Sequence, residues 1–284
     1  MSKQGVDISY CQGTPDFAKL AKNVDFVILQ AGYGRYSYQK DKTFERNYAE
    51  CKKYKIPVGV YWFSYAESPA DAKAEAAACM EVIKGKQFEY PIYYDVESRA
   101  LSGDVYGKCR AFCDELEKNG YFAGIYISRS PAQSYLPANV GNKYALWLAE
   151  YNNKCYYSGT YGMWQNSSTW STGGIATNVD HDYCYVDYPS MIKRLGLNGF
   201  PKSEPTEVLD EKGMIKGDKG QNVLAYKQLL IIAKKRGLIK QSVNSDGGFG
   251  DGTEIATNEM LKYLGYVPNG IAGNNLIKKL GEVL

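Results

Sequence analysis

The sequence predicts an α/β protein: an irregular (β/α) barrel of the TIM type, followed by a small all-α domain of three helices. Short apolar runs of strand length recur through about the first 190 residues, and amphipathic stretches separate the earlier ones. This alternation favours a parallel barrel over a β-sandwich. A change of composition near residue 197 predicts the second domain.

The barrel elements are expected in a regular order. Strands are predicted at residues 5–8, 26–31, 58–65, 92–96, 122–127, 145–149, 163–165 and 179–183. Helices are predicted at 41–54, 69–84 and 105–118, the second beginning at a favourable Ser68-Pro69 start. The last three strands stand close together in the sequence, so full helices do not fit between them and the barrel should be irregular.

The domain boundaries follow from turn residues and composition. Residues 1–197 form the barrel, and 198–210, which contain two prolines, are predicted to be a linker. Residues 211–284 form the second domain, with helices expected at 221–236, 253–264 and 274–280. A core of this size is small but viable.

Charge and hydropathy narrow the function classes. The net charge of +3 gives no case for a nucleic-acid partner. No stretch approaches the ~20 apolar residues of a membrane span, so no membrane insertion is expected. The N-terminal residues lack the apolar region of a signal peptide, which predicts synthesis in the cytoplasm.

The seven cysteines show no pattern of a metal site or a disulfide framework. There is no CxxC pair and only one histidine, so no metal or other cofactor is expected. Free thiols indicate a reducing place of synthesis. A cysteine nucleophile working with His181 is disfavoured, because both groups would need pre-arranged partners.

Acidic residues stand at predicted strand ends, which is where α/β barrels carry their functional groups. Asp7 ends the first strand, Asp95 and Glu97 end the fourth, and Asp180 lies in the last. Two residues apart on a strand, Asp95 and Glu97 face the same way, with Cα atoms roughly 6.6 Å apart. One acid of such a cluster should keep its proton near neutral pH. A protonated carboxyl beside an ionised one is what glycosidic cleavage requires.

Tyrosine is abundant, with 26 residues. Aromatic rings suit the apolar faces of sugars, but they also fill barrel cores. Both explanations remain open for the aromatic residues near the predicted strand ends.

At this point the sequence resembles the family 25 glycoside hydrolases, the Chalaropsis-type lysozymes of bacteria and their phages. The resemblance rests on an ordered set of segments over residues 5 to about 188: GVDISYCQG, VDFVILQAGYG, NYAECKKYKIPVGVYWFSYA, YPIYYDVE, GYFAGIYIS, YALWLAEY, GMWQNSS and NVDHDY. It implies hydrolysis of the β-1,4 bond between N-acetylmuramic acid and N-acetylglucosamine in bacterial peptidoglycan.

The resemblance also implies residue roles. Glu97 would be the general acid. Asp95 would orient the 2-acetamido group of the substrate or act as the second carboxylate, and Asp7 and Asp180 would tune the cluster. The family often has Asn at the position of Asp182, and Asp180 is chosen as the cleft residue because it follows the strand directly. Packing and substrate binding remain alternatives for the expected groove residues Tyr33, Tyr61, Tyr93, Tyr126, Glu150, Trp164 and Gln165.

The C-terminal part resembles a three-helix peptidoglycan-binding domain through GDKGQNVLAYKQLL, SDGGFGDGTEIATNEML and PNGIAGNNLIKKL. We expect Phe249 to pack inward and Thr253 to cap the next helix. The 246–251 loop has some likeness to a calcium loop, but the alternating acids and the final glutamate are missing, which disfavours calcium.

Taken together, these features predict an endolysin-like muramidase that is made without a signal peptide and acts at the cell wall after release. The alternatives are a wall-binding protein with an inactive barrel and a glycosidase acting on chitin or another N-acetylated glucan. The sequence leaves the retaining, inverting or substrate-assisted mechanism and the oligomeric state open.

Overall fold

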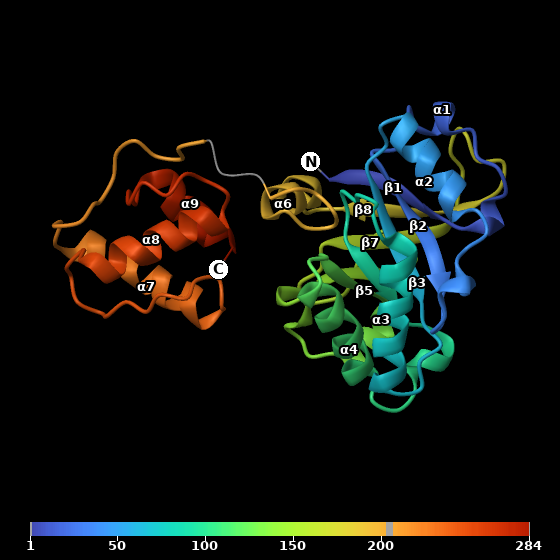
Figure 1. Ribbon diagram of the computed structural model, residues 1–284, viewed down its shortest axis with the longest axis horizontal. Coiled ribbons are helices and arrows are strands. Elements are labelled where there is room, and N and C mark those ends of the chain that lie inside the picture. Colours follow the sequence, from blue (N-terminus) through green and yellow to red (C-terminus); the bar gives the residue numbers. More distant parts are fainter. Residues whose placement is uncertain (1, 203–206, 284) are drawn as a thin grey trace. The chain divides into compact units, whose positions relative to one another are not determined.

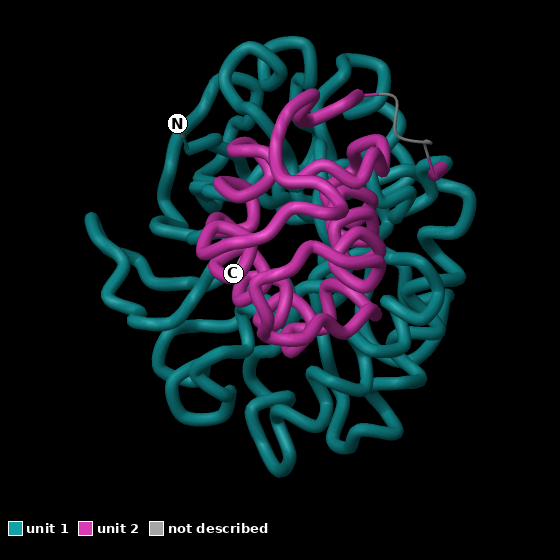
Figure 2. Tube along the Cα trace, turned by 90° about the vertical axis from the view of Figure 1, so that its left-hand side faces the viewer, with its two compact units in different colours: residues 1–201 teal, residues 202–284 magenta. Residues whose placement is uncertain are grey.

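The computed structural model describes residues 2–202 and 207–283, and the chain divides into two compact units. Unit 1 is Met1–Pro201 and unit 2 is Lys202–Leu284, coloured separately in Figure 2. Of the predicted linker, residues 203–206 lie outside the described residues. None of the described helices is long and apolar enough to span a membrane.

Unit 1 is a closed barrel whose eight strands follow one another in chain order (Figure 1). The predicted barrel fold is confirmed. From β1 to β7 each strand runs parallel to the next. The strands are β1 (Lys3–Ile8), β2 (Phe26–Tyr33), β3 (Val58–Phe63), β4 (Ile92–Asp95), β5 (Ala123–Ser128), β6 (Ala145–Ala149), β7 (Met163–Trp170) and β8 (Val179–Cys184).

The prediction of an all-parallel barrel is wrong at the last strand. β8 runs antiparallel to both β7 and β1. Only residues 171–178 join β7 to β8, and they form no helix. A parallel pair requires a crossover of a dozen or more residues, so the chain reverses direction as a hairpin instead.

Helices cover the outside of the earlier strands, and α3 and α4 pack against each other there (Figure 1). Ser68 caps α3 by accepting from the Asp71 amide, and the Asp71 side chain accepts from the Ser68 amide in return. The sequence predicted α2, α3 and α4 but missed the other three. The helices are α1 (Phe17–Leu20), α2 (Phe44–Lys53), α3 (Pro69–Ile83), α4 (Val105–Lys118), α5 (Arg129–Tyr135) and α6 (Tyr188–Leu195).

Alternation along the strands separates the two faces of the barrel wall. One set of side chains packs with the helices, and the other forms a second cluster inside the barrel that includes Tyr93, Tyr126, Trp147 and Met163. Gly124 makes room for the interior rings, since a Cβ there would lie 2.5 Å from the Tyr93 ring. The interior below the mouth is therefore filled.

Unit 1 extends beyond the predicted boundary at residue 197, to Pro201. Asn198 is fully buried, and its side chain donates to the Phe88 and Tyr90 carbonyls and accepts from the Phe122 amide. The first residues of the predicted linker are thus held in the barrel by hydrogen bonds that composition does not reveal.

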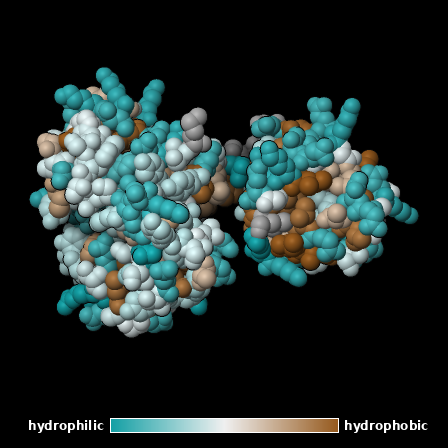
Figure 3. Space-filling model, turned by 180° about the vertical axis from the view of Figure 1, so that it is seen from behind, coloured by the Kyte–Doolittle hydropathy of each residue, from teal (hydrophilic) through white to brown (hydrophobic). Residues whose placement is uncertain are grey.

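Unit 2 contains α7 (Gln221–Lys235), α8 (Asp251–Tyr263) and α9 (Asn274–Val283) around its own core. Phe249 is buried, as predicted, and it stacks on Tyr226. The expected Thr253 cap is wrong, because α8 begins at Asp251 and Thr253 lies within its first turn. Figure 3 shows apolar residues gathered on the drawn face of this unit, as expected where a small core cannot cover all its apolar surface.

Candidate active site

The four predicted acids lie at one mouth of the barrel. Asp7 of β1 is the register partner of Asp180 of β8, and Asp95 ends β4. Glu97 follows two residues later in extended backbone. The groups also interact electrostatically, since the charge of Glu97 raises the pKa of both Asp95 and Asp180. Three strands therefore bring one acidic cluster together.

Asp180 reaches this mouth for a different reason from the one predicted. It is the second residue of β8, near the strand's beginning rather than its end. Because β8 is antiparallel, its beginning lies beside the carboxyl end of β1. Asp180 rather than Asp182 was predicted to be the residue that faces the cleft. Residues two apart on a strand face the same side, so both side chains point into the barrel.

Asp182 is an interior acid that sequence reasoning left out of the site. It is fully buried and accepts a 2.8 Å hydrogen bond from the Trp147 indole, while its Oδ2 has no partner among the described residues. Burial, then the charge of Asp7, raises its pKa well above the ordinary value. The D-x-D spacing in NVDHDY was the signal that could have identified it.

Asp95 and Glu97 form the pair best suited to hold a proton. Asp95 is 5% exposed, and its Oδ1 lacks a hydrogen-bond partner in the described part of the chain. Burial, then the charges of Glu97 and Asp7, raises the pKa of Asp95 well above its ordinary value. Burial also raises the pKa of Glu97, opposed by the nearby Tyr126 hydroxyl. Both acids therefore favour their neutral forms more than exposed carboxyls do.

The chain turns sharply directly after this pair. Ser98 has a φ of 44°, in the left-handed region that non-glycine residues rarely adopt. The turn leads into a short 3₁₀ helix, Ser98–Leu101, and leaves Glu97 extended at the strand end. Backbone strain of this kind often accompanies functional positions.

Asp7 is held in place by Gln165, which was predicted to contact the substrate. Gln165 is 2% exposed and donates to Asp7 Oδ2 at 2.8 Å. Its Oε1 accepts from the hydroxyls of Tyr126 and Tyr151, at 2.9 and 3.1 Å. Burial, then the charge of Asp180, raises the pKa of Asp7 well above its ordinary value. Gln165 therefore orients an acid, and Tyr126 is buried beside it.

A groove of about 700 Å³ opens next to the acids. Tyr61 connects the two, since it lines the groove and the charges of Asp7 and Asp95 raise its pKa after burial. Tyr33 stands at the groove surface, 38% exposed. The groove is lined by Ser9, Tyr10, Cys11, Gln30, Tyr33, Lys40, Asp41, Lys42, Tyr61, Phe63 and Tyr65.

Of the seven predicted groove residues, Tyr33 and Tyr61 line this groove and the other five do not. Tyr93 is fully buried and packs on Trp147, one layer below Asp95 on the inner face of β4. Trp164 alternates with the inward Gln165 and stacks on Tyr183 instead, on the outer side of the sheet. Sequence position at a strand end could not distinguish these layers and faces.

Glu150 is held in an ion pair rather than standing free. Its carboxylate lies 3.1 Å from Arg129 and accepts from the Tyr156 amide at 2.8 Å. Its backbone carbonyl accepts from the Trp164 indole at 2.8 Å. The side chain therefore fixes the segment after β6.

The described residues offer no cysteine–histidine pair. His181 points outward, with its ring nitrogens 2.7 Å from Asn166 Oδ1 and 3.1 Å from Gln4 Oε1. Nor do residues 2–202 and 207–283 contain a cluster of His, Cys, Asp and Glu suited to a metal ion. In the calcium-like loop of unit 2, the Lys227 ammonium lies 2.5 Å from Asp246, where a cation would bind.

Solved structures similar to this chain include one autolysin and two endolysins. The modular autolysin LytC of Streptococcus pneumoniae, in complex with a synthetic peptidoglycan ligand, is 30% identical over 65% of this chain, with a TM-score of 0.59. This chain spans 47% of that protein. The catalytic domain of endolysin ply40 from bacteriophage P40 of Listeria monocytogenes is 25% identical, covering 68% of this chain and 97% of that one, with a TM-score of 0.58.

The third similar structure covers more of this chain, but its low sequence identity supports a similar fold only. The CTP1L endolysin is 22% identical, covering 82% of this chain and 80% of its own, with a TM-score of 0.62. No curated protein matches the chain. The family model for glycosyl hydrolases family 25 matches residues 6–175, a range that holds Asp7, Asp95 and Glu97. The chain belongs to glycosyl hydrolase family 25.

Proposed function

We propose that this protein is a muramidase that hydrolyses the β-1,4 bond between N-acetylmuramic acid and N-acetylglucosamine in bacterial peptidoglycan. The observation that carries the proposal is the pair formed by buried Asp95 and partly buried Glu97, whose pKa values burial raises, beside a groove lined by aromatic residues. Tyrosine rings along that groove suit the apolar faces of a glycan strand. Its site of action would be the cell wall.

In this mechanism Glu97 is the general acid. Burial raises its pKa, which favours the protonated form that can donate to the departing glycosidic oxygen. The remaining carboxylates stabilise the positive charge that develops on the sugar ring, and a water molecule that adds to the anomeric carbon, losing a proton to a carboxylate, completes the hydrolysis. Asp95, with a free Oδ1, is suited to accept a hydrogen bond from the 2-acetamido N–H of the substrate. Gln165 holds the carboxylate of Asp7 in one orientation through its hydrogen bond.

Unit 2 would hold the enzyme on its polymer. A second binding site on the same chain raises the local concentration of substrate at the barrel, even when each contact is weak. The sequence resemblance of residues 211–284 to peptidoglycan-binding domains supports this role.

The test is mass spectrometry of purified peptidoglycan after digestion. Muramic acid at the new reducing ends is expected. Glucosamine at those ends would make the enzyme a glucosaminidase, and cleavage of chitin in preference to peptidoglycan would favour the other glycosidase alternative.

A variant pair then tests the acid. Glu97→Gln should abolish lysis while leaving wall binding intact, because an amide is too weak an acid to protonate the departing oxygen. Glu81→Gln on α3, an exposed glutamate, is the matched control and should retain full activity. Near-normal lysis by Glu97→Gln would remove Glu97 from the acid role, and an inactive wild-type protein that still bound walls would identify an inactive barrel.

A further inference from the structure

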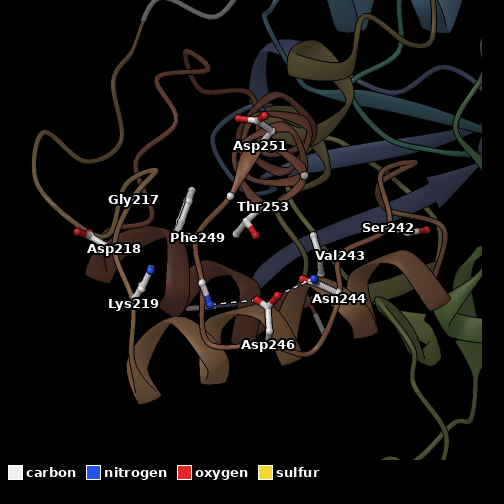
Figure 4. A pocket seen from close by; sticks show the side chains of 13 residues that line it. Gly217, Asp218, Lys219, Ser242, Val243, Asn244, Asp246, Phe249, Asp251 and Thr253 are labelled. Carbon is white, nitrogen blue, oxygen red and sulfur yellow. Dashed lines mark hydrogen bonds between the residues drawn. The ribbon is translucent and has the colours of Figure 1, made fainter.

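Unit 2 contains a pocket of about 540 Å³, separate from the acidic mouth of the barrel. Figure 4 shows Asp246 and Asp251 at opposite ends of this pocket, with Phe249 and Thr253 between them. It is lined by Gly217, Asp218, Lys219, Ser242, Val243, Asn244, Asp246, Gly248, Phe249, Gly250, Asp251, Gly252 and Thr253.

The pocket wall is held in place before any ligand arrives. Lys227, 1% exposed, donates to Asn244, Asp246 and the Gly248 carbonyl at 2.6, 2.5 and 2.8 Å. The opposite wall is tied to it through a bridge between Lys219 and Gly248. A preformed site of this kind loses little conformational entropy on binding.

The carboxylates of the pocket are already engaged within unit 2. Asp246 is paired with Lys227, Asp251 is paired with Lys216, and Asp218 accepts from the Ile215 amide at 2.9 Å. Lys219, by contrast, makes no ion pair with any described residue. Asp218 likewise makes no ion pair with a described residue, so the unpaired charges at this pocket are those of Asp218 and Lys219, and Lys219 is the one that an anion can pair with.

Hydrogen-bond donors also converge there. α8 begins at the pocket, and its N-cap Gly250 provides no side-chain acceptor for the first-turn amides of Asp251 and Gly252. The Thr253 hydroxyl lines the same space on a residue 3% exposed, and it makes no hydrogen bond with the other residues drawn in Figure 4. Amides at a helix N-terminus, with their positive dipole end, favour an anion.

We propose that this pocket binds a short peptide by its free C-terminal carboxylate. The carboxylate would accept from the α8 amides and the Thr253 hydroxyl and would pair with Lys219. Val243 and Phe249 give the pocket an apolar side that suits small apolar side chains rather than a sugar or a phosphate. The peptide stems of peptidoglycan present this chemistry, so the identity of the peptide rests on the proposed function.

The experiment uses the full chain carrying Glu97→Gln, titrated with acetyl-Lys-D-Ala-D-Ala and with its C-terminal amide. Calorimetry should give about tenfold tighter binding of the free acid, the effect of about one charge-assisted contact. Lys219→Met and Thr253→Val should each remove most of that difference. Lys235→Met, an exposed lysine at the far end of α7, is the matched control and should change nothing.

Equal binding of acid and amide would overturn the proposal, as would an equal loss with Lys235→Met. Competition by inorganic phosphate as effective as by the peptide would reduce the pocket to a general anion site and also reject it. Melting curves check that each variant folds. These titrations do not depend on hydrolysis, so an inactive wild-type barrel would refute the proposed muramidase while leaving the pocket's result standing.

Discussion

Gln165 donates a 2.8 Å hydrogen bond from Nε2 to Oδ2 of Asp7, and its own amide oxygen accepts from the Tyr126 hydroxyl at 2.9 Å. One buried amide thus links β7 to β1 and β5 at the level of the acids. The carboxylate of Asp7 cannot turn without losing this donor. Its orientation is therefore fixed by a residue on another strand.

Replacing Gln165 with Met, which has a similar size, should lower kcat on purified walls by about tenfold or more, as the loss of a hydrogen bond to a charged group does. Asp7 would then lose its donor and be free to reorient. KM should change less, because the groove surface is untouched. Unchanged kcat would mean that Asp7 needs no orientation, and Asn152→Asp, an exposed control, should behave as wild type.

Asp95→Asn should abolish activity yet stabilise the barrel at pH 7. The pKa of Asp95 is raised in the folded state, mainly by burial. Between the ordinary and the raised value, the folded protein holds a proton that the unfolded chain has lost, so stability falls as pH rises through that window. Removing the charge should raise the Tm, about 2–4 °C for each kcal/mol recovered.

Comparing the Tm of Asp95→Asn with that of wild type at about pH 3.5, near the ordinary carboxyl pKa, provides the control. There most of the unfolded chain is also protonated, so the two melting temperatures should converge. A Tm for Asp95→Asn below that of wild type at pH 7 would show that the ionised carboxylate stabilises the fold.

The pH profile of kcat should fall on its basic side as Glu97 loses its proton. The Tyr126 hydroxyl lowers the pKa of Glu97, opposing the effect of burial. Tyr126→Phe removes that influence, so the pKa of Glu97 should rise and the basic limb should move to higher pH. A limb that moves to lower pH, or that stays in place, would assign it to another group.

Lys227→Met should destabilise unit 2 while leaving the barrel unaffected. The variant leaves Asn244, the Gly248 carbonyl and Asp246 without their common donor, at a cost of about 1–3 kcal/mol. All four tryptophans lie before residue 171, so their fluorescence reports the barrel alone. Hydrogen exchange over residues 221–264 measures unit 2 directly, and calcium should not restore its protection.

Thiol labelling should separate the cysteines by burial. Cys11 is exposed and Cys155 is partly buried, whereas Cys51, Cys79, Cys109, Cys113 and Cys184 are buried, and burial raises the pKa of each of these thiols. A thiol reagent at pH 8 should react quickly with Cys11 and with all seven only after denaturation. Rapid labelling of any buried thiol would indicate local opening of the barrel wall.

The fold and the acidic cluster could be predicted because they depend on local patterns. Apolar runs of strand length identified the barrel, and the D-x-E spacing placed Asp95 and Glu97 on one face. Trp164 and Tyr93 show where such reasoning ends. Both stand on strands that form the barrel, yet one faces outward and the other lies a layer too deep, which only the register of neighbouring strands determines.

Asp182 and Asn198 show a second limit. The burial of Asp182 inside the barrel and the hydrogen bonds that join Asn198, near the end of unit 1, to three backbone groups are long-range arrangements. Asn198 leaves no periodic trace in the residues around it, and Asp182 leaves only the D-x-D spacing that it shares with Asp180. The structure places Asp180 beside Asp7, through a reversal of β8 that was not predicted.

The reversal also has a consequence for how this enzyme type can diversify. Residues 171–178 connect the mouth end of β7 to the mouth end of β8 with no helix to preserve. Insertions there could reshape the rim beside Asp180 at little cost to the rest of the barrel. Related enzymes should therefore vary most in length at this hairpin. Insertions there could change which polymer the enzyme prefers without changing the fold of the barrel.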